Sequence, residues 1–443
     1  MRNTCLAIIA VLALGVLSPA GGLTAAPPAW RITVAAGDVD RSNLPVRAAI
    51  SATPAELSSL GVSVKFADGS QVAGQIVPRG LLDAAAGSRP LATDAAADTP
   101  QAWDILFVLP KLTAGSTADL IAELVVANPA GAVPGQSARL QWGDSAGAAE
   151  LFLSGKPLVR YEMPTYDGSN EQNRVKTYKP FHHVFDPATG MKLTKGDGGG
   201  YTHHRGIFFG YNRISHGPDK KQSSDCWHCK SPARQEHREV LWQKAVDVAG
   251  VQRVAIDWIG SDGMKLLGET RELDIVPVSG GTVIDFASRL VADAPVRLDG
   301  DPQHSGVHFR AANEVHESTK GQTYYLRPGV KAKPGDYRNW PADKTYVNAA
   351  WHAASFVVGG QRYTVLRANR PANPGEARMS ERDYGRFGSY FEYDLTADKP
   401  LEVGYRFWVQ PGEMTLEEAA RISADYAQPA KVTAVRRDAG GAG

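Results

Sequence analysis

Short apolar runs that alternate with polar residues recur along the first third of the chain. Residues 30–34, Trp-Arg-Ile-Thr-Val, alternate in this way, and further short runs follow at 45–50, 62–66, 105–109 and 120–126. A period of two is typical of a β-strand with one buried face. Because no amphipathic helix pattern interrupts these runs, we expect residues 27–135 to form a small immunoglobulin-like β-sandwich.

Two segments of this region lack periodicity. Residues 83–101 mix Ala, Asp and Pro, which is a composition typical of a mobile loop. Residues 128–135, Asn-Pro-Ala-Gly-Ala-Val-Pro-Gly, combine several turn-forming residues. We therefore expect the first domain to end at residue 135.

Longer and more aromatic apolar runs dominate the chain from about residue 137. They lie at 151–153, 158–163, 207–211, 251–259, 283–291, 306–311, 354–366 and 401–409. Strand patterns of this extent without crossover helices exclude a parallel doubly wound sheet and favour large antiparallel sheets packed face to face. The predicted fold class is therefore all-β, with a second and larger domain at residues 136–427.

A helix signal of note comes only near the end of the chain. Thr415 and Glu418 form a capping box ahead of an amphipathic stretch, so a short helix is predicted over residues 415–426. Residues 428–443 are predicted to be a disordered tail.

The first residues have the features of a secretory signal peptide. Arg2 precedes an apolar run at 6–17, and small residues follow up to Ala26. We expect a leader at residues 1–26 and a periplasmic or secreted mature protein, with an uncleaved anchor as the alternative. The apolar run is short for a membrane span, and no later run reaches about 18 apolar residues, so no membrane contact is expected after cleavage.

Charge and cysteine content narrow the classes of partner. The formal net charge is +1, and loss of the leader with Arg2 makes basic and acidic residues equal in number, so nothing favours nucleic acid as a partner. Cys226 and Cys229, in Cys-Trp-His-Cys, form either a short-loop disulfide or free thiols. A zinc site built from this segment alone would lack half of its ligands.

The densest chemical signal is the stretch 199–210, in which His203, His204 and Arg205 lie between glycines and an aromatic pair. Glycines permit unusual backbone angles and close approach of a ligand, so the two histidines are expected to converge in a loop. Six further histidines, which concentrate within the central part of the chain, mark this region as the candidate site: His182, His183, His216, His228, His304 and His308.

A second cluster follows in the stretch 304–310. If it forms a strand, His304, His308 and Arg310 share one face, while Val307 and Phe309 share the other. Residues four apart on a strand are separated by ~13 Å, so both histidines cannot chelate one ion. We therefore predict no cofactor, although a single divalent metal ion would remain compatible with one of them.

The sequence identifies acid–base and substrate-binding residues less clearly than it identifies the histidine-rich stretches. The predicted catalytic residues are His203, His204, His304, Glu269, Asp383 and Tyr384, and the predicted substrate-binding residues are Arg205, His308, Arg310, Lys179, His183, Asn369 and Trp227. Alternating charges in a sheet also form cross-strand ion pairs, which is the competing interpretation for the carboxylates. Asn369 belongs to a Pro-rich loop, 369–374, that is suited to hydrogen-bond a hydroxyl-rich ligand.

Several of these segments together resemble a known family. They are residues 34–46, 178–186, 203–206 (His-His-Arg-Gly), 304–310, 369–374 and 382–385. In this order they resemble the bacterial family labelled PmoA-like, or "methane oxygenase PmoA", across most of the mature chain. The resemblance implies a β-supersandwich similar to galactose mutarotases and sugar lyases, and a role in carbohydrate use.

We therefore expect a secreted carbohydrate-active enzyme that cleaves a glycosidic bond, with carbohydrate as its partner. In a lyase, a histidine or Tyr384 would remove the proton beside a uronate carboxylate that Arg205 or Arg310 neutralises. In a hydrolase, Glu269 and Asp383 would act across the sugar. The alternatives are a mutarotase-like isomerase, a non-catalytic carbohydrate-binding protein and, last, a metal-dependent oxygenase. A copper-dependent polysaccharide oxygenase needs an amino-terminal histidine, which cleavage near Ala26 does not provide.

Overall fold

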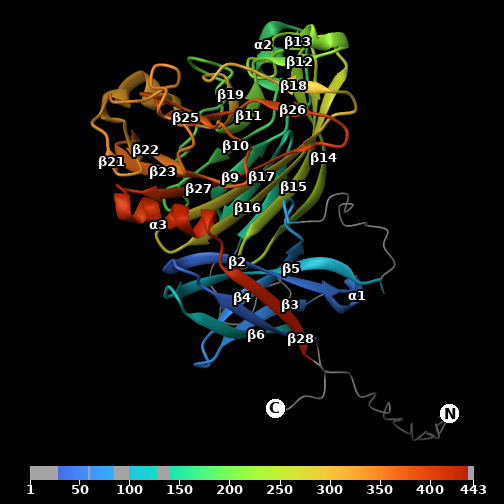
Figure 1. Ribbon diagram of the computed structural model, residues 1–443, viewed down its shortest axis with the longest axis vertical. Coiled ribbons are helices and arrows are strands. Elements are labelled where there is room, and N and C mark those ends of the chain that lie inside the picture. Colours follow the sequence, from blue (N-terminus) through green and yellow to red (C-terminus); the bar gives the residue numbers. More distant parts are fainter. Residues whose placement is uncertain (1–27, 58–59, 84–98, 127–139, 438–443) are drawn as a thin grey trace, which may run out of the picture.

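The computed structural model describes residues 28–57, 60–83, 99–126 and 140–437. The expected leader, the expected boundary at 128–135 and most of the expected 83–101 loop lie outside the described residues. The described chain forms two β units, a smaller amino-terminal one and a larger one that carries the remaining sheets (Figure 1). Every strand pair is antiparallel, so the predicted all-β fold class is confirmed.

The amino-terminal unit is one seven-stranded sheet that curls around its own core. In spatial order its strands are β2 (Arg41–Ala52), β5 (Gln101–Leu112), β4 (Gln71–Pro78), β3 (Leu60–Phe66), β6 (Thr117–Val126), β1 (Ala29–Ala35) and β28 (Lys431–Arg437). The two outermost strands, β2 and β28, contact each other, so the sheet nearly closes. In β1, Trp30, Ile32 and Val34 point inward and are buried, as the alternating pattern predicts.

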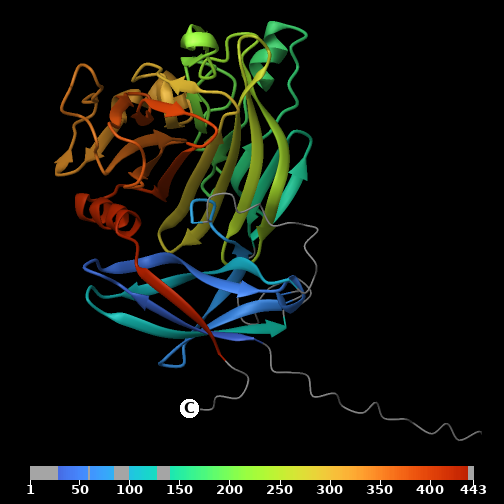
Figure 2. The same cartoon turned by 45° about the vertical axis from the view of Figure 1, so that its right-hand side comes forward.

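The last strand of this sheet comes from the other end of the chain. Residues 431–437 form β28, which pairs with β1 from Ala29 opposite Arg437 to Ala35 opposite Lys431. The prediction of a disordered tail is therefore wrong for these residues, because the alternating Val432 and Ala434 pack against the amino-terminal core. Figures 1 and 2 both show β28 running from the larger unit along the smaller one.

Two large sheets form the body of the second unit. The eight-stranded sheet has the order β24 (Arg378–Arg382), β25 (Arg386–Tyr390), β19 (Ser305–Arg310), β11 (Ile207–Tyr211), β10 (Phe181–Val184), β9 (Lys156–Glu162), β8 (Ala148–Leu153) and β7 (Leu140–Ser145). The nine-stranded sheet has the order β14 (Arg234–Ala245), β15 (Gly250–Ile259), β16 (Lys265–Val278), β17 (Gly281–Val291), β27 (Leu401–Pro411), β23 (Gln361–Asn369), β22 (Trp351–Val358), β20 (Tyr324–Arg327) and β21 (Val330–Lys331).

These two sheets pack face to face around the main core. On β19, Val307 and Phe309 point into it, and on the neighbouring β11, Phe209 lies 5.1 Å from the ring of Trp258 in the facing sheet. Because successive side chains of a strand point to opposite faces, Phe208, His308 and Arg310 must lie on the outer face of the eight-stranded sheet. The candidate site is built on that outer face.

The remaining elements are short. A four-stranded sheet has the order β13 (Gln222–Ser224), β12 (Ile214–His216), β18 (Val296–Leu298) and β26 (Tyr393–Leu395), and the helical segments are α1 (Pro54–Leu57), α2 (Glu171–Thr177), η1 (Pro218–Lys220), η2 (Val315–Thr319), η3 (Lys320–Gln322) and α3 (Leu416–Ala427). The predicted carboxyl-terminal helix is confirmed as α3, whose cap Thr415 accepts a hydrogen bond from the Glu418 amide. None of the described helices is long and apolar enough to cross a membrane.

Helix α2 was not expected, because it lacks an apolar stripe. None of its residues is buried, and it begins where the Asn170 side chain accepts a hydrogen bond from the Asn173 amide, 2.8 Å away. The helix therefore depends on its cap and on contacts at its carboxyl end, one of which belongs to the candidate site.

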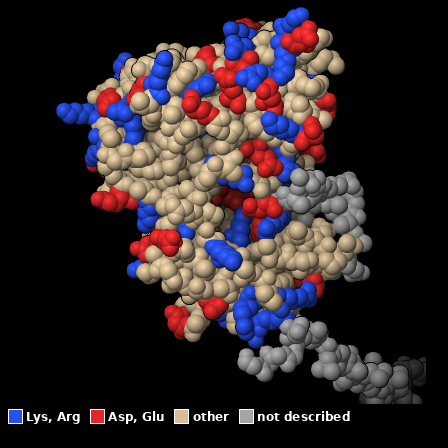
Figure 3. Space-filling model, in the orientation of Figure 1, with Lys and Arg blue, Asp and Glu red and all other residues tan. Residues whose placement is uncertain are grey.

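The amino-terminal unit docks on the outer face of the nine-stranded sheet. Arg47 of β2 donates two hydrogen bonds of 2.8 Å to Asp274 of β16, and Arg253 of β15 donates one of 2.7 Å to the backbone oxygen of Arg79 in the smaller unit. Ala73, Val77 and Leu106 of the smaller unit share an apolar cluster with residues of the larger one. Figure 3 shows a recess with acidic and basic side chains between the two units.

Candidate functional site

The outer face of the eight-stranded sheet carries a buried histidine and aromatic cluster. Phe208 of β11 and His308 of β19 lie side by side on this face, and Trp227 covers them, with its ring 4.7 Å from Phe208 and 4.9 Å from His308. The loop before β11 places His204 against the same tryptophan, at 5.8 Å. The sequence thus brings three separate segments to one place: 201–208, 225–228 and 304–310.

Two histidines at the edge of this cluster are each held by an aspartate. The Nδ1 atom of His228 lies 2.8 Å from Asp225 Oδ2, and the Nδ1 atom of His304 lies 2.9 Å from Asp301 Oδ1. Burial alone would raise the pKa values of both carboxyls, but the hydrogen bonds with the imidazoles outweigh it, so that the pKa of Asp225 is lowered and that of Asp301 falls to about 2. Each aspartate therefore stays ionised and orients its imidazole with Nε2 free.

The two dyads face each other. The ring centroids of His228 and His304 are 5.0 Å apart, and their side chains remain 26% and 33% exposed, respectively. Both come from the same local pattern, Asp-x-x-His, at 225–228 and 301–304. The sequence analysis names His228 among the surrounding histidines but gives it no role, and it names neither aspartate; the repeated Asp-x-x-His spacing is the sequence signal that marks both dyads.

His203 and His204 continue the cluster inward. The ring of His203 lies 4.5 Å from His228 and 4.2 Å from His204, so the predicted convergence of the adjacent pair in a loop is what the structure contains. Burial, reinforced by the charge of His228, lowers the pKa of His203 to about 2, and burial together with Arg386 holds the pKa of His204 far below its usual value. Both rings are therefore neutral at physiological pH.

Tyr384 and Tyr201 close the other side of the cluster. Their rings stack at 5.4 Å, and Tyr201 lies 5.5 Å from His204. Tyr201 is 48% exposed and has a positive φ of 56°, which is an uncommon conformation for a non-glycine residue. Beneath Tyr384, the guanidinium carbon of Arg310 lies 4.5 Å from the ring centroid. Tyr201 is therefore the exposed lid of a polar interior.

This interior holds cations without carboxylate partners among the described residues. Arg310 donates to the backbone oxygens of Ala311 and Tyr384, while its Nε and Nη2 atoms make no hydrogen bond. Burial, reinforced by Arg310, lowers the pKa of the neighbouring Lys195 to about 7, and burial lowers the pKa of Arg310 itself to about 10. Buried charges without partners are costly, so this interior favours an anionic group over a neutral or cationic one.

Glu269 lies outside this cluster and does not fit the predicted catalytic role. Its carboxylate, on β16 in the other large sheet, accepts hydrogen bonds of 2.8 Å from Arg271 Nε and from Trp258 Nε1. Ser288 Oγ donates a further bond of 2.9 Å. Neither the Glu269 nor the Arg271 side chain is exposed, so the pair is a structural ion pair between the sheets.

Three of the predicted substrate-binding side chains are used within the fold. Lys179 donates to the backbone oxygens of His203 and Trp227, and Arg205 donates to carbonyls at the end of α2, including that of Lys176 at 3.4 Å. His308 has both ring nitrogens occupied, by Ser305 O at 2.9 Å and by an Arg386 nitrogen at 3.1 Å. We therefore assign Lys179, Arg205 and His308 to shaping the cluster, and not to binding substrate.

The other predicted residues divide by position. His183 is buried beside Thr194, whose Oγ1 lies 2.9 Å from its Nδ1, and Asn369 lines a separate cavity near Ser389. Asp383 precedes Tyr384 in the turn between β24 and β25 and is half-buried. His203, His204, Arg310 and Trp227 belong to the cluster and have nitrogen atoms without a hydrogen-bond partner among the described residues. His304 and Tyr384 belong to the cluster through their ring contacts.

The side-chain positions show the state of the two cysteines and how possible metal ligands are grouped. Cys226 and Cys229 are buried free thiols, so the alternative of a short-loop disulfide is excluded, and burial raises the pKa of both. Within the described ranges, no group of three or more His, Cys, Asp or Glu side chains is placed to hold a metal ion. The two dyads can supply acid–base chemistry, and a positively charged interior lies beneath Tyr201.

Comparison with known proteins places this cluster in a family. A family model described as a family of unknown function (DUF6807) matches residues 148–424. A search of curated proteins gave no match. The matched segment covers both large sheets except the edge strand β7, extends into α3, and includes every histidine of the cluster. Because it spans more than half of the chain, the protein belongs to this family of unknown function (DUF6807).

Proposed function

We propose that this protein is a carbohydrate-active enzyme that cleaves a glycosidic bond by β-elimination beside a uronate carboxylate. The observation that carries the proposal is the pair of aspartate-held histidines, His228 and His304, with ring centroids 5.0 Å apart and partly exposed side chains. A general base needs an oriented, reachable nitrogen, and elimination needs a second group to protonate the departing oxygen. The two dyads supply one group for each role.

In this proposal His304 is the base and His228 the acid. His304 Nε2 takes the proton from the carbon next to the carboxylate, the resulting electron pair forms a carbon–carbon double bond, and the glycosidic carbon–oxygen bond breaks. The departing oxygen takes its proton from His228 Nε2. No water is consumed, and the products are an unsaturated uronate and a new sugar end. Asp301 and Asp225 act as positioning residues that fix the orientation of the two imidazole rings.

The substrate carboxylate is assigned to Arg310. Its Nε and Nη2 atoms make no hydrogen bond, and Lys195 adds a second cation nearby. A guanidinium of this kind neutralises the carboxylate and stabilises the negative charge that develops on it during proton removal. Arg310 is fully buried, so the carboxylate reaches it only when Tyr201 moves away from Tyr384.

Elimination is favoured over hydrolysis by the position of the acids. Hydrolysis uses two carboxylates across the scissile bond. Glu269, one member of the expected pair, is held in a buried ion pair with Arg271, and its side chain is not exposed. The aspartates that do reach the cluster, Asp225 and Asp301, point their oxygens at histidine nitrogens. We further propose that the enzyme works in the periplasm or outside the cell, on the basis of the leader predicted from residues 1–26.

The test is product formation from uronate polysaccharides. Polygalacturonate, alginate and glucuronan are incubated with the full mature chain, and the double bond of the product is followed by ultraviolet absorbance. His304→Ala and His228→Ala should each lower the rate by roughly 10²–10⁴-fold. The matched control is His237→Ala, a half-buried histidine on β14 that contacts Tyr161 but no residue of the cluster.

Other outcomes would select the alternatives. Cleavage without an absorbing product would mean hydrolysis, and unchanged rates in both histidine variants would refute the assigned roles. Binding of the polysaccharide without any turnover would leave a carbohydrate-binding protein. A rate that disappears on treatment with a chelator and returns with a divalent ion would overturn the metal-free mechanism.

A further inference from the structure

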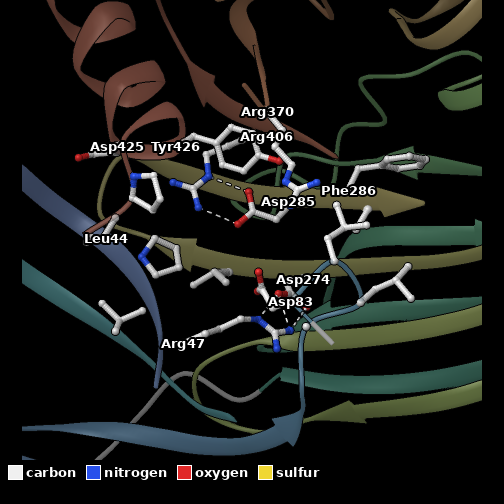
Figure 4. A pocket seen from close by; sticks show the side chains of 18 of the residues that line it. Leu44, Arg47, Asp83, Asp274, Asp285, Phe286, Arg370, Arg406, Asp425 and Tyr426 are labelled. Carbon is white, nitrogen blue, oxygen red and sulfur yellow. Dashed lines mark hydrogen bonds and ion pairs between the residues drawn. The ribbon is translucent and has the colours of Figure 1, made fainter. Parts of the chain in front are cut away.

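A cavity lies between the two units, and none of its lining residues belongs to the histidine cluster. It has a volume of about 500 Å³, within the range of small-ligand sites, and is walled by β2, β16, β17, β27, α3 and the loop after β23. Figure 4 shows Arg47, Asp274, Asp285, Arg406, Arg370 and Tyr426 around it. None of these residues contributes to the proposed elimination, so the cavity is not explained by it.

One wall of the cavity is polar and consists of charged side chains from three adjacent strands. Asp274 of β16 lies directly opposite Asp285 of β17, which lies directly opposite Arg406 of β27. Arg406 donates two hydrogen bonds of 2.7 Å to Asp285, and Arg47 reaches over from the amino-terminal unit to Asp274. Like charges directly opposite each other destabilise a sheet. The facing carboxylates of Asp274 and Asp285 are therefore unfavourable by themselves, and an arginine paired with each of them offsets their repulsion.

The charges of this wall are almost fully compensated. Besides these two ion pairs, the lining carboxylates of Glu272 and Asp425 are paired with arginines outside the cavity. Among the residues that the structure describes, two charged lining groups have no ion-pair partner, Asp83 and Arg370, and they have opposite signs. A charged ligand would therefore gain little net attraction, whereas a neutral ligand with many hydroxyls could use both the acceptors and the donors.

Arg370 also connects this cavity to a neighbour. It belongs to the Pro-rich loop 369–374 that the sequence marks as suited to a hydroxyl-rich ligand, and together with Pro371 and Ala427 it lines a second cavity of about 400 Å³. Asn369 lies in that second cavity. The half-buried Arg370 thus has donors at the junction of two adjoining spaces, which suits a ligand longer than one sugar ring.

We infer that the interdomain cavity is a non-catalytic binding site for a neutral, hydroxyl-rich ligand of about disaccharide size. Planar carboxylates and guanidiniums pair with neighbouring hydroxyls by hydrogen bonds, and the partly exposed Pro45 and Leu82 of the lining offer an apolar surface for the carbon–hydrogen face of a ring. This inference does not depend on the proposed function, since it concerns binding at a separate place.

The experiment measures binding of cellobiose, maltose and lactose to the full mature chain by calorimetry and saturation-transfer NMR. At least one of the three should bind, and Arg370→Ala should weaken it roughly tenfold through loss of charged hydrogen bonds. Ala372→Trp, on the exposed part of the loop, should block the cavity without burying anything new in the core. Arg338→Ala is the matched control, because Arg338 is a partly exposed arginine outside both cavities, paired with Asp343.

Each result decides the inference. No binding of any of the three sugars, or binding that both Arg370→Ala and Ala372→Trp leave unchanged, overturns it. Preferential binding of glucuronate or glucosamine would show that the ligand is charged and that the neutral class is wrong. Binding abolished by His304→Ala would place the sugar in the histidine cluster. Binding retained in His304→Ala supports the inference even if no lyase activity is found, so its failure and that of the proposed function are distinguishable.

Discussion

The buried ion pair of Glu269 and Arg271 gives a prediction that separates structure from catalysis. The Glu269 carboxylate accepts bonds of 2.8 and 3.0 Å from Arg271, one of 2.8 Å from Trp258 and one of 2.9 Å from Ser288. Glu269→Ala leaves the Arg271 cation buried without an anion, which costs about 3–5 kcal/mol. For the larger unit, residues 140–427, an unfolding entropy of about 2.1 cal/mol/K per residue converts this cost into a fall in melting temperature of roughly 5–8 °C.

Removing the charge of both partners should restore most of this loss. In the double variant Glu269→Leu with Arg271→Met no charge is left unpaired, and replacing a buried pair with apolar side chains is often neutral or stabilising by ~1–4 kcal/mol. The control is Glu402→Ala: Glu402 pairs with Arg289 at side-chain exposures of 30% and 16%, and its loss should cost under about 1 kcal/mol.

The assay is thermal unfolding by circular dichroism, with activity measured on the variants that remain folded. A Glu269→Ala variant as stable as the control would refute the reasoning, because the pair would then contribute nothing by its burial. A double variant that is folded and stable but inactive would return Glu269 to the catalytic residues. An active double variant would confirm that the carboxylate is structural.

Three further predictions test other parts of the structure. Burial lowers the pKa of His203 to about 2 and that of His183 to about 3, so below about pH 6.5 the unfolded chain binds protons that the native state does not. The free energy of unfolding should therefore fall on acidification by about 1.4 kcal/mol per pH unit for each group. In urea unfolding, the loss of stability between pH 7 and pH 5 should be smaller for His203→Gln than for the unchanged protein. Thr415→Ala removes the cap of α3 and should cost about 1 kcal/mol in the same unfolding assay, whereas Thr415→Ser should cost little. Deleting residues 431–443 exposes the edge of β1 and should make the amino-terminal unit sensitive to limited proteolysis, and resistance equal to that of the full chain would contradict the pairing of β28.

Local periodicity was sufficient for the fold class and for one face of the site. The alternation in the 304–310 stretch correctly separates the core residues Val307 and Phe309 from His308 and Arg310 on the outer face. His304 is an exception, because it precedes β19 and is held by Asp301 in a turn. Period-two reasoning applies only inside the strand, and the sequence does not mark where the strand begins.

The roles of the other predicted site residues depend on contacts with side chains from distant parts of the chain. A local sequence pattern does not reveal such contacts. Glu269 looks like a free acid in the sequence, but Trp258 and Ser288 reach it from the strands on either side. His308 looks available until Arg386 and the Ser305 carbonyl occupy its two nitrogens. The same-strand neighbours of a residue can be deduced from spacing, whereas the side chains that cross from other strands depend on the register of the whole sheet.

The return of the chain to its beginning as β28 has a consequence for biosynthesis. Domains generally fold as units in the order in which they emerge, with the amino-terminal unit first. Here the smaller unit, although synthesised first, acquires its seventh strand only when residues 431–437 become available. Until then one edge of β1 remains open to other strands. The amino-terminal unit is therefore complete only after residues 431–437 have been synthesised.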